Sequence, residues 1–299
     1  MPTQTDVIIS FLEEKERKEG ILPKLLEFYR KLLQVQSQVE KKLTSRLEPS
    51  LSRDATSKRT NDGVPLISFD ELALDWQLLV TTFDEIKIIF ASYAAIFKSN
   101  YEGLAELEAD VLLTRPVLKQ WFEKQKLPSR ISAKDADNKL INSIIHATIK
   151  PFLVSHAKTL RDSIDHERWR RSYCPICGGS ADFAFLDTER GSRWLLCSRC
   201  DTEWPFQRLQ CPYCDTQDQN DLSYFVDDSG LYRLYTCERC KHYLKTIDLR
   251  QTEGQVILPL ERFHTLDMDR QAVEMGYKPY DKTTRVPKST YKDKHTRQK

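Results

Sequence analysis

Apolar residues recur every three or four positions through much of the first 165 residues, with charged residues between them. Between residues 21 and 47 this stripe consists of Leu22, Leu25, Leu26, Tyr29, Leu32, Leu33, Val39 and Leu43. Such spacing places the apolar side chains on one face of a helix. Similar stripes run through residues 115–126 and 137–165, and we expect Pro151 to kink the longer segment because it lacks a backbone N–H. The pattern therefore predicts helices over all three segments.

Capping and turn residues predict where further helices and loops of the first half begin and end. Ser68 and Glu71 have the spacing of a capping box, and Ile67 and Leu72 that of a hydrophobic staple, so we predict that a helix begins at Phe69 and continues to about residue 86. Residues 48–65 are polar and turn-rich, which predicts a loop. Glycine is rare and strong helix formers are common, so we expect residues 1–168 to form an all-α domain.

The pattern changes at about residue 173 to short alternating runs that are separated by Gly, Asp and Ser. Segments 183–185, 193–196 and 222–226 are typical of strands in β-hairpins. A short helix is predicted from Leu266 to Gly276 within a C-terminal helical segment, 259–280. Residues 281–299 carry seven Lys or Arg against two Asp and no core-forming run, so we expect a disordered basic tail. The chain is therefore predicted to be α+β.

All eight cysteines fall in the hairpin region and form four Cys-x-x-Cys pairs: Cys174, Cys177, Cys197, Cys200, Cys211, Cys214, Cys237 and Cys240. A first unit (Cys-Pro-Ile-Cys, hairpin, Cys-Ser-Arg-Cys) is followed by a second of the same kind (Cys-Pro-Tyr-Cys, hairpin, Cys-Glu-Arg-Cys). A hairpin that brings two such pairs together completes a tetrahedral shell of four sulfurs. The repeat predicts two metal-binding ribbons, 169–208 and 209–258, each holding one ion. A cross-braced arrangement, in which the first and third pairs share a metal, is possible but breaks the repeat.

The ligands do not determine which metal is bound, because four tetrahedral thiolates suit both iron and zinc. Gly178 follows the first pair and suits a left-handed backbone conformation, whereas Asp215 at the matching place tolerates it less easily. The second site is therefore expected to be slightly less ideal. Because the hairpins have little apolar core of their own, metal removal should unfold them.

Other roles for the cysteines are less well supported. Disulfides need an oxidising compartment, and the first residues resemble no export signal, so we expect a cytoplasmic protein. Cys211-Pro-Tyr-Cys214 also occurs in dithiol redox enzymes, but the helix that such a site requires is not predicted after it. The longest apolar stretch, Ile88 to Phe97, is too short to span a membrane.

The charge, the histidines and the aromatic residues limit the classes of function that the sequence supports. The net charge is +2, and residues 171–250 carry 10 basic against 12 acidic residues, which disfavours nucleic-acid binding. His146 and His156 are interpreted as packing residues, and His242 adjoins a site that four cysteines already close. No catalytic signature is found, so we expect no enzyme. An aromatic set either packs between the ribbons or lines a protein-binding face: Trp204, Phe206, Tyr224, Tyr232 and Tyr243.

Four segments around the cysteines carry a resemblance to a known family. They are Tyr173-Cys-Pro-Ile-Cys-Gly178, Arg193-Trp-Leu-Leu-Cys-Ser-Arg-Cys-Asp-Thr-Glu-Trp204, Cys211-Pro-Tyr-Cys214 and Cys237-Glu-Arg-Cys-Lys-His-Tyr-Leu-Lys-Thr-Ile-Asp248. Together they closely resemble the FdhE-type formate dehydrogenase accessory proteins. The resemblance is strong over about residues 170–250 and fits the first half only in class and length.

This resemblance implies a helical domain followed by two tandem rubredoxin-like modules, with iron held by the eight cysteines. It also implies a cytoplasmic maturation factor that binds the catalytic subunit of an exported respiratory formate dehydrogenase before translocation. Thr202, Glu203 and Trp204 form a family-like segment of unknown role. An electron-transfer or thiol-redox protein that acts on the client's metal centre is the alternative, and a nucleic-acid-binding zinc ribbon is a distant third. The sequence does not indicate an oligomeric state.

Overall fold

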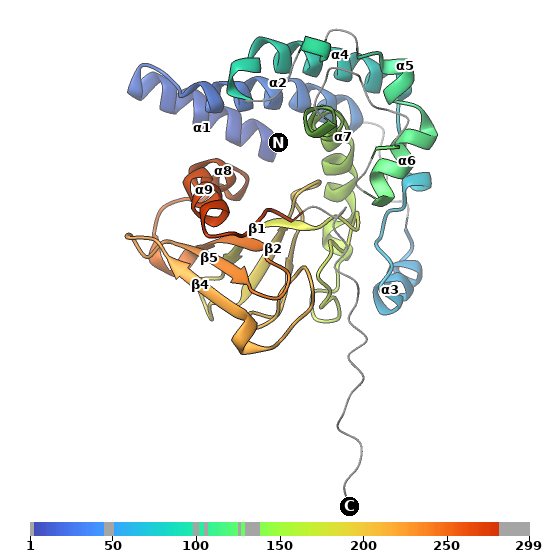
Figure 1. The fold of residues 1–299 in the computed structure, drawn as a ribbon. Helices are drawn as coiled ribbons and strands as arrows, with labels where there is room; N and C mark the ends of the chain where they lie inside the picture. Colours follow the sequence, from blue (N-terminus) through green and yellow to red (C-terminus); the bar gives the residue numbers. More distant parts are fainter. Residues whose placement is uncertain are drawn as a thin grey trace, which may run out of the picture.

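A computed structural model describes residues 3–44, 51–97, 102–104, 107–124, 127–128 and 138–280. Its first half is helical, with α1 (Gln4–Glu19), α2 (Lys24–Thr44), α3 (Arg53–Asp62), α4 (Trp76–Ser92), α5 (Ala109–Leu112), α6 (Arg115–Lys124) and α7 (Asn138–Leu160). A six-stranded sheet follows, and α8 (Leu258–His264) and α9 (Leu266–Glu274) lie against it (Figure 1). The predicted basic tail, 281–299, lies outside the described residues.

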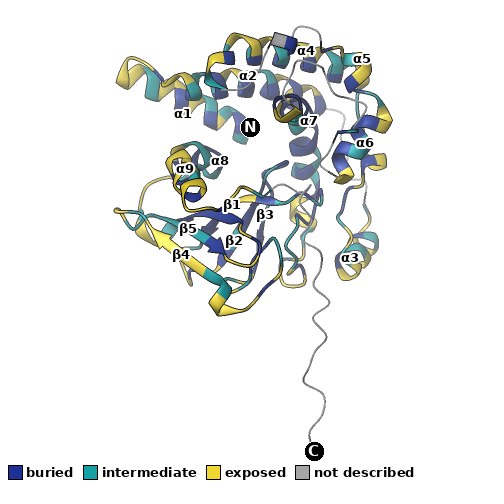
Figure 2. Cartoon of the chain, viewed as in Figure 1, coloured by how far each residue is buried: buried dark blue, intermediate teal, exposed yellow. Residues whose placement is uncertain are grey.

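Helix α7 is the centre of the helical layer. It packs against α2 and α4, and most of its surface is buried (Figure 2). Phe83 and Ile86 of α4 and Ile141 and Phe152 of α7 are completely shielded from solvent. The apolar stripes that predicted α2, α6 and α7 are thus the faces that form the core. Pro151 lies inside α7.

Two details of the helical half differ from the prediction. The capping box of Ser68 and Glu71 opens only a short 3-10 turn, Phe69–Glu71, and α4 begins at Trp76, where the carboxylate of Asp75 accepts a hydrogen bond from the N–H of Leu78 at 3.0 Å. The chain between them is extended because Phe69 and Leu72 both turn into the core.

The second difference is α3, which lies in the segment predicted as a loop. Its sequence is almost entirely polar, so it has no apolar stripe to reveal it. The helix is instead defined by its ends: Ser52 caps the first turn, and Gly63 ends it with a φ of 69°.

The sheet has the strand order β3-β2-β1-β6-β5-β4. The first cysteine unit supplies β1 (Ala181–Leu186), β2 (Arg193–Cys197) and β3 (Glu203–Pro205), and the second supplies β4 (Leu222–Val226), β5 (Tyr232–Cys237) and β6 (Tyr243–Asp248). Neighbours are antiparallel except β1 and β6, which pair in parallel from Phe183 opposite Lys245 to Leu186 opposite Asp248. The predicted α+β fold is confirmed, and the two units share one continuous sheet.

Charged contacts join the helical layer to the sheet. Asp201, which follows the first cysteine unit, accepts hydrogen bonds from Lys150 of α7 at 3.0 Å and from Arg262 of α8 at 2.7 Å. Arg262 also donates to Asp182 at the start of β1.

In the part of the chain that the structure describes, no helix is both long enough and apolar enough to cross a lipid bilayer.

Candidate metal centres

The eight cysteines form two separate clusters. One contains Cys174, Cys177, Cys197 and Cys200, the other Cys211, Cys214, Cys237 and Cys240, and within each the four Sγ atoms lie within 4.8 Å of one another. This is the grouping that the internal repeat predicts. Each cluster therefore draws its two pairs from the two ends of one hairpin unit.

The sulfur spacing fits a metal ion. Neighbouring Sγ atoms are 3.5 and 3.6 Å apart in the first cluster and 3.7 Å apart in the second. Four sulfurs placed tetrahedrally around an ion at about 2.3 Å are separated by about 3.8 Å. All eight cysteines are free rather than disulfide-bonded. Each cluster can thus hold one ion of a metal that accepts four thiolates, and iron and zinc both satisfy this condition.

All four Cys-x-x-Cys segments fold into the same tight turn. In each, the residue after the second cysteine donates its N–H to the carbonyl of the first, at 2.8–3.3 Å. These residues all have positive φ: Gly178 (67°), Asp201 (53°), Asp215 (61°) and Lys241 (57°). The left-handed conformation expected at Gly178 and Asp215 is therefore confirmed. It also occurs at two positions that sequence reasoning missed, although their place after each pair was a usable signal.

The first cluster is built into the main core of the protein. Its cysteines are at most 2 % exposed. The carbonyls of Pro175 and Ile176 accept backbone hydrogen bonds from Leu66 and Ile67 at 2.8 and 2.9 Å. Arg199, between the last two cysteines, reaches α6 and donates to the carbonyl of Phe122 at 2.7 Å. This cluster therefore connects the sheet to the helical half.

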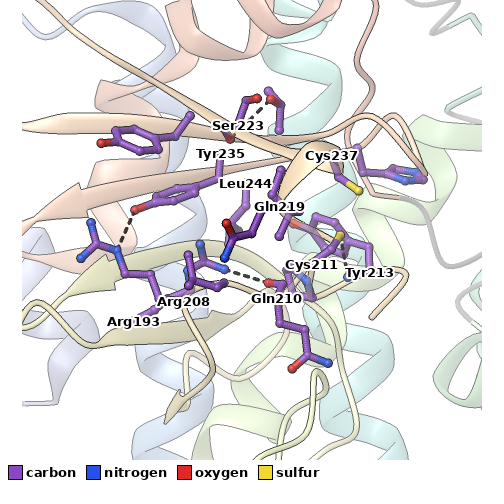
Figure 3. A pocket seen from close by; sticks show the side chains of 16 residues that line it. Arg193, Arg208, Gln210, Cys211, Tyr213, Gln219, Ser223, Tyr235, Cys237 and Leu244 are labelled. Atoms are coloured by element: carbon purple, nitrogen blue, oxygen red, sulfur yellow. Dashed lines mark hydrogen bonds between the residues drawn. The ribbon is translucent and has the colours of Figure 1, made fainter. Parts of the chain in front are cut away.

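The second cluster lies nearer the surface. Cys214 is partly exposed, and its three partners form a small apolar cluster of their own with Tyr213 and Leu222. A cavity of about 380 Å³ opens beside it, with Cys211, Cys237 and Tyr213 at one end and Arg193 and Arg208 at the other (Figure 3). The two clusters thus share a local geometry but differ in their surroundings.

Burial and hydrogen bonding among the thiols shift the pKa values of the cysteines in both directions. Burial raises the pKa of the Cys174 thiol well above its usual range. In the second cluster, hydrogen bonding to Cys214 raises the pKa of Cys211, while hydrogen bonds from its three neighbours lower the pKa of Cys214. A bound divalent ion would displace the thiol protons, because the thiolate is the form that binds metal.

The three histidines considered in the sequence analysis pack against neighbouring residues of the fold. The ring of His146 lies tilted against that of Trp121, with the centroids 6.0 Å apart, and the Nε2 of His156 accepts a hydrogen bond from the N–H of Ala73 at 3.2 Å. His242 is buried against the rings of Tyr213 and Tyr280. No histidine joins either cysteine cluster among the residues that the structure describes.

The family-like segment lines the first cluster. The Oγ1 of Thr202 is 3.1 Å from the Sγ of Cys200, and Trp204 donates its Nε1–H to the carbonyl of Arg171 at 2.9 Å. Burial raises the pKa of Glu203. Of the aromatic set, Trp204, Phe206 and Tyr243 are buried, whereas Tyr224 is 50 % exposed. Three of the five aromatic residues thus pack inside the protein, whereas Tyr224 lies at its surface.

Comparison with known proteins gives three results. Residues 173–208 match the family model described as FdhE, central domain. A protein named FdhE homolog from Aquifex aeolicus (strain VF5) is 26% identical over 257 residues, which is 85% of each chain, and one from Haemophilus influenzae (strain PittEE) is 35% identical over 107 residues, or 35% of each chain. The crystal structure of the FdhE protein from Pseudomonas aeruginosa has the same fold, with a TM-score of 0.57 over 95% of each chain at 18% identity. The resemblance to the FdhE-type proteins that the cysteine motifs predict is therefore confirmed.

Proposed function

We propose that this protein is an accessory factor for the assembly of respiratory formate dehydrogenase. In this role it binds the catalytic subunit in the cytoplasm before export and performs no catalysis itself. The observation that carries the proposal is the similarity to FdhE-type proteins along most of the chain, combined with two four-cysteine clusters.

The eight cysteines are the proposed ligands of two metal ions: Cys174, Cys177, Cys197 and Cys200 for one, and Cys211, Cys214, Cys237 and Cys240 for the other. A bound iron or zinc would act as a cross-link between the two ends of each hairpin unit. The division into a helical domain (1–168), two ribbons (169–208 and 209–258), a C-terminal helical segment (259–280) and a basic tail (281–299) is part of this proposal.

The test is co-purification with the client. The full chain, expressed with a C-terminal affinity tag in cells that make formate dehydrogenase, should enrich the catalytic subunit before export. A deletion strain should lose formate dehydrogenase activity and regain it with the wild-type chain. Absence of the subunit from the purified fraction, together with normal activity in the deletion strain, would refute the proposal.

A rubredoxin-like redox protein is the second candidate, because Cys214 gives the second cluster access to solvent. This role requires an iron that is reduced and reoxidised reversibly. Protein purified without oxygen should then show thiolate-to-iron absorption bands that bleach on reduction and return on oxidation. A fully functional protein that contains only zinc would eliminate this candidate, since zinc has no redox chemistry.

A further inference from the structure

The two edges of the sheet are unlike each other. At one edge lies β3, which has only three residues, ends at Pro205 and contains the fully buried Trp204. At the other edge lies β4, Leu222–Val226, far from the helical layer and largely exposed (Figures 1 and 2). Proteins commonly protect an edge strand with a charge, a proline or a bulge. The Leu-Ser-Tyr-Phe-Val sequence of β4 has none of these, and its register with β5 is uninterrupted.

The backbone of β4 offers hydrogen-bonding groups on its outer side. The N–H of Asp227 donates to the carbonyl of Tyr232 at 3.1 Å, and the N–H of Glu238 donates to that of Asp221 at 2.8 Å. In an antiparallel pair such contacts recur at every second residue, so Ser223 and Phe225 bond to β5. The backbone groups of Leu222, Tyr224 and Val226 therefore point outward, and among the described residues none pairs with another strand.

Both faces beside this edge are hollowed. On one face, Tyr224 and its cross-strand partner Tyr235 line the cavity of about 380 Å³ next to the second cluster. On the other face, Phe225 and its partner Leu234 line a hollow of about 370 Å³ together with Met268 and Met275. A strand added to β4 would alternate its side chains between these two hollows.

The end of the cavity that lies away from the second cluster is positively charged. The cavity lining contains Arg193 and Arg208 and neither Asp nor Glu. Arg193 is 3 % exposed, and its guanidinium lies 4.3 Å from the centre of the Tyr235 ring. Its Nη1 donates to the carbonyl of Gln210 at 3.1 Å, while its Nε has no partner. Arginine in such a place favours a carboxylate.

From these observations we infer that β4 docks an extended segment of a partner protein as a seventh strand, with acidic side chains entering the arginine-lined cavity and apolar side chains entering the hollow beside α9. Main-chain hydrogen bonds would supply affinity, and the two hollows would supply specificity. The inference rests on the proposed function only for the identity of the partner.

The test uses two fluorescein-labelled peptides of equal length, one alternating Glu and Val, the other alternating Lys and Val. Fluorescence anisotropy with the full, metal-loaded chain should show at least tenfold tighter binding of the acidic peptide. Arg208→Gln should reduce that preference about tenfold. Equal binding of the two peptides by the wild type would overturn the inference.

A proline variant tests the strand-addition step. Val226→Pro removes one outward N–H at an edge position where proline is tolerated, and Val226→Ala is the matched control that keeps the N–H. Val226→Pro should weaken peptide binding at least tenfold, and Val226→Ala less than threefold. Unchanged binding by Val226→Pro would refute strand addition.

Metal content and mass in solution must be measured for each variant. If Arg208→Gln loses metal, the arginines serve the cysteine cluster and the acidic preference is refuted. If the wild type is a dimer by light scattering and Val226→Pro is a monomer, β4 pairs with a second copy and the partner segment is refuted. Co-purification of the formate dehydrogenase subunit with Val226→Pro at the wild-type level would overturn this inference and leave the proposed function intact.

Discussion

Loss of the first metal should destabilise the whole protein, whereas loss of the second should loosen only its own surroundings. The perturbations are Cys174→Ser and Cys211→Ser, each of which removes one ligand from one cluster. Ser198→Ala and Arg239→Ala are the matched controls, because each lies inside a Cys-x-x-Cys turn without supplying a sulfur. Each cysteine variant should lose about one of two metal ions, measured by elemental analysis.

The difference in stability follows from the contacts of the first cluster. Its turn accepts backbone hydrogen bonds from Leu66 and Ile67, worth about 1 kcal/mol each, and Arg199 donates a charge-assisted bond to the carbonyl of Phe122, worth about 1.5 to 3 kcal/mol. If the turn loses its geometry with the metal, the helical half loses about 4 kcal/mol of stabilisation. In the second cluster, by contrast, the hydroxyl of Tyr213 donates to the carbonyl of Ala181, which lies in the sheet, at 3.4 Å.

Hydrogen exchange measured by mass spectrometry can separate the two outcomes. In Cys174→Ser, the amides of α6 and α7 should exchange about a thousandfold faster, which corresponds to about 4 kcal/mol. In Cys211→Ser, faster exchange should be confined to β4, β5 and the turns of the second cluster. Equal exchange in α6 for the two variants, or an unchanged α6 in Cys174→Ser, would show that the first cluster does not support the helical half.

Three further predictions concern single residues. The buried carboxylate of Asp248 accepts hydrogen bonds from Arg250 at 2.8 Å and Arg233 at 2.6 Å, which lower its pKa to about 2. The ionised carboxylate therefore stabilises the fold above about pH 4, and about 2 kcal/mol of this stabilisation is lost as the pH falls to about 2. Asp248→Asn should remove this acid dependence in urea unfolding across that range, and an unchanged dependence would refute the assignment. Lys241→Gly should bind metal about fivefold tighter than Lys241→Ala in a chelator competition, because glycine alone adopts a φ of 57° without strain, and equal affinities would contradict this. Trp204→Phe should lower the unfolding free energy by about 1 to 3 kcal/mol through the unpaired carbonyl of Arg171, and a value near zero would mean that water replaces the indole.

The parts of this structure that the sequence predicts are those whose signal is local. Each Cys-x-x-Cys pair forms its turn from consecutive residues, and the spacing of the pairs within a unit assigns them to one cluster. Helices α2, α6 and α7 were likewise predicted because their buried faces are continuous apolar stripes. Local patterning of this kind reflects nearest-neighbour geometry and needs no knowledge of the rest of the fold.

The unpredicted parts depend on distant residues or on weak local signals. Helix α3 has almost no buried apolar face and is held at its end by the hydroxyl of Tyr173, which donates to the carbonyl of Gly63 at 2.7 Å. The parallel pairing of β1 with β6 joins two strands about 60 residues apart in the sequence, and the sequence of neither strand indicates which strand it pairs with. The burial of one cysteine cluster and the exposure of the other follow from that pairing and from the helices around it.

The difference in burial between the two cysteine clusters suggests a different physical role for each copy of the duplicated unit. The parallel contact between β1 and β6 places the first unit against the helical layer and the second at the outside of the sheet. A four-thiolate ion in the first unit would stabilise residues that already belong to the main core, so variation there is costly. An ion in the second would help to hold β4 and β5 in register beside the cavity of Arg193 and Arg208. We therefore expect loss of the second metal to abolish binding of the acidic peptide while leaving the helical half folded, and a metal-free second cluster that still binds the peptide would contradict this division.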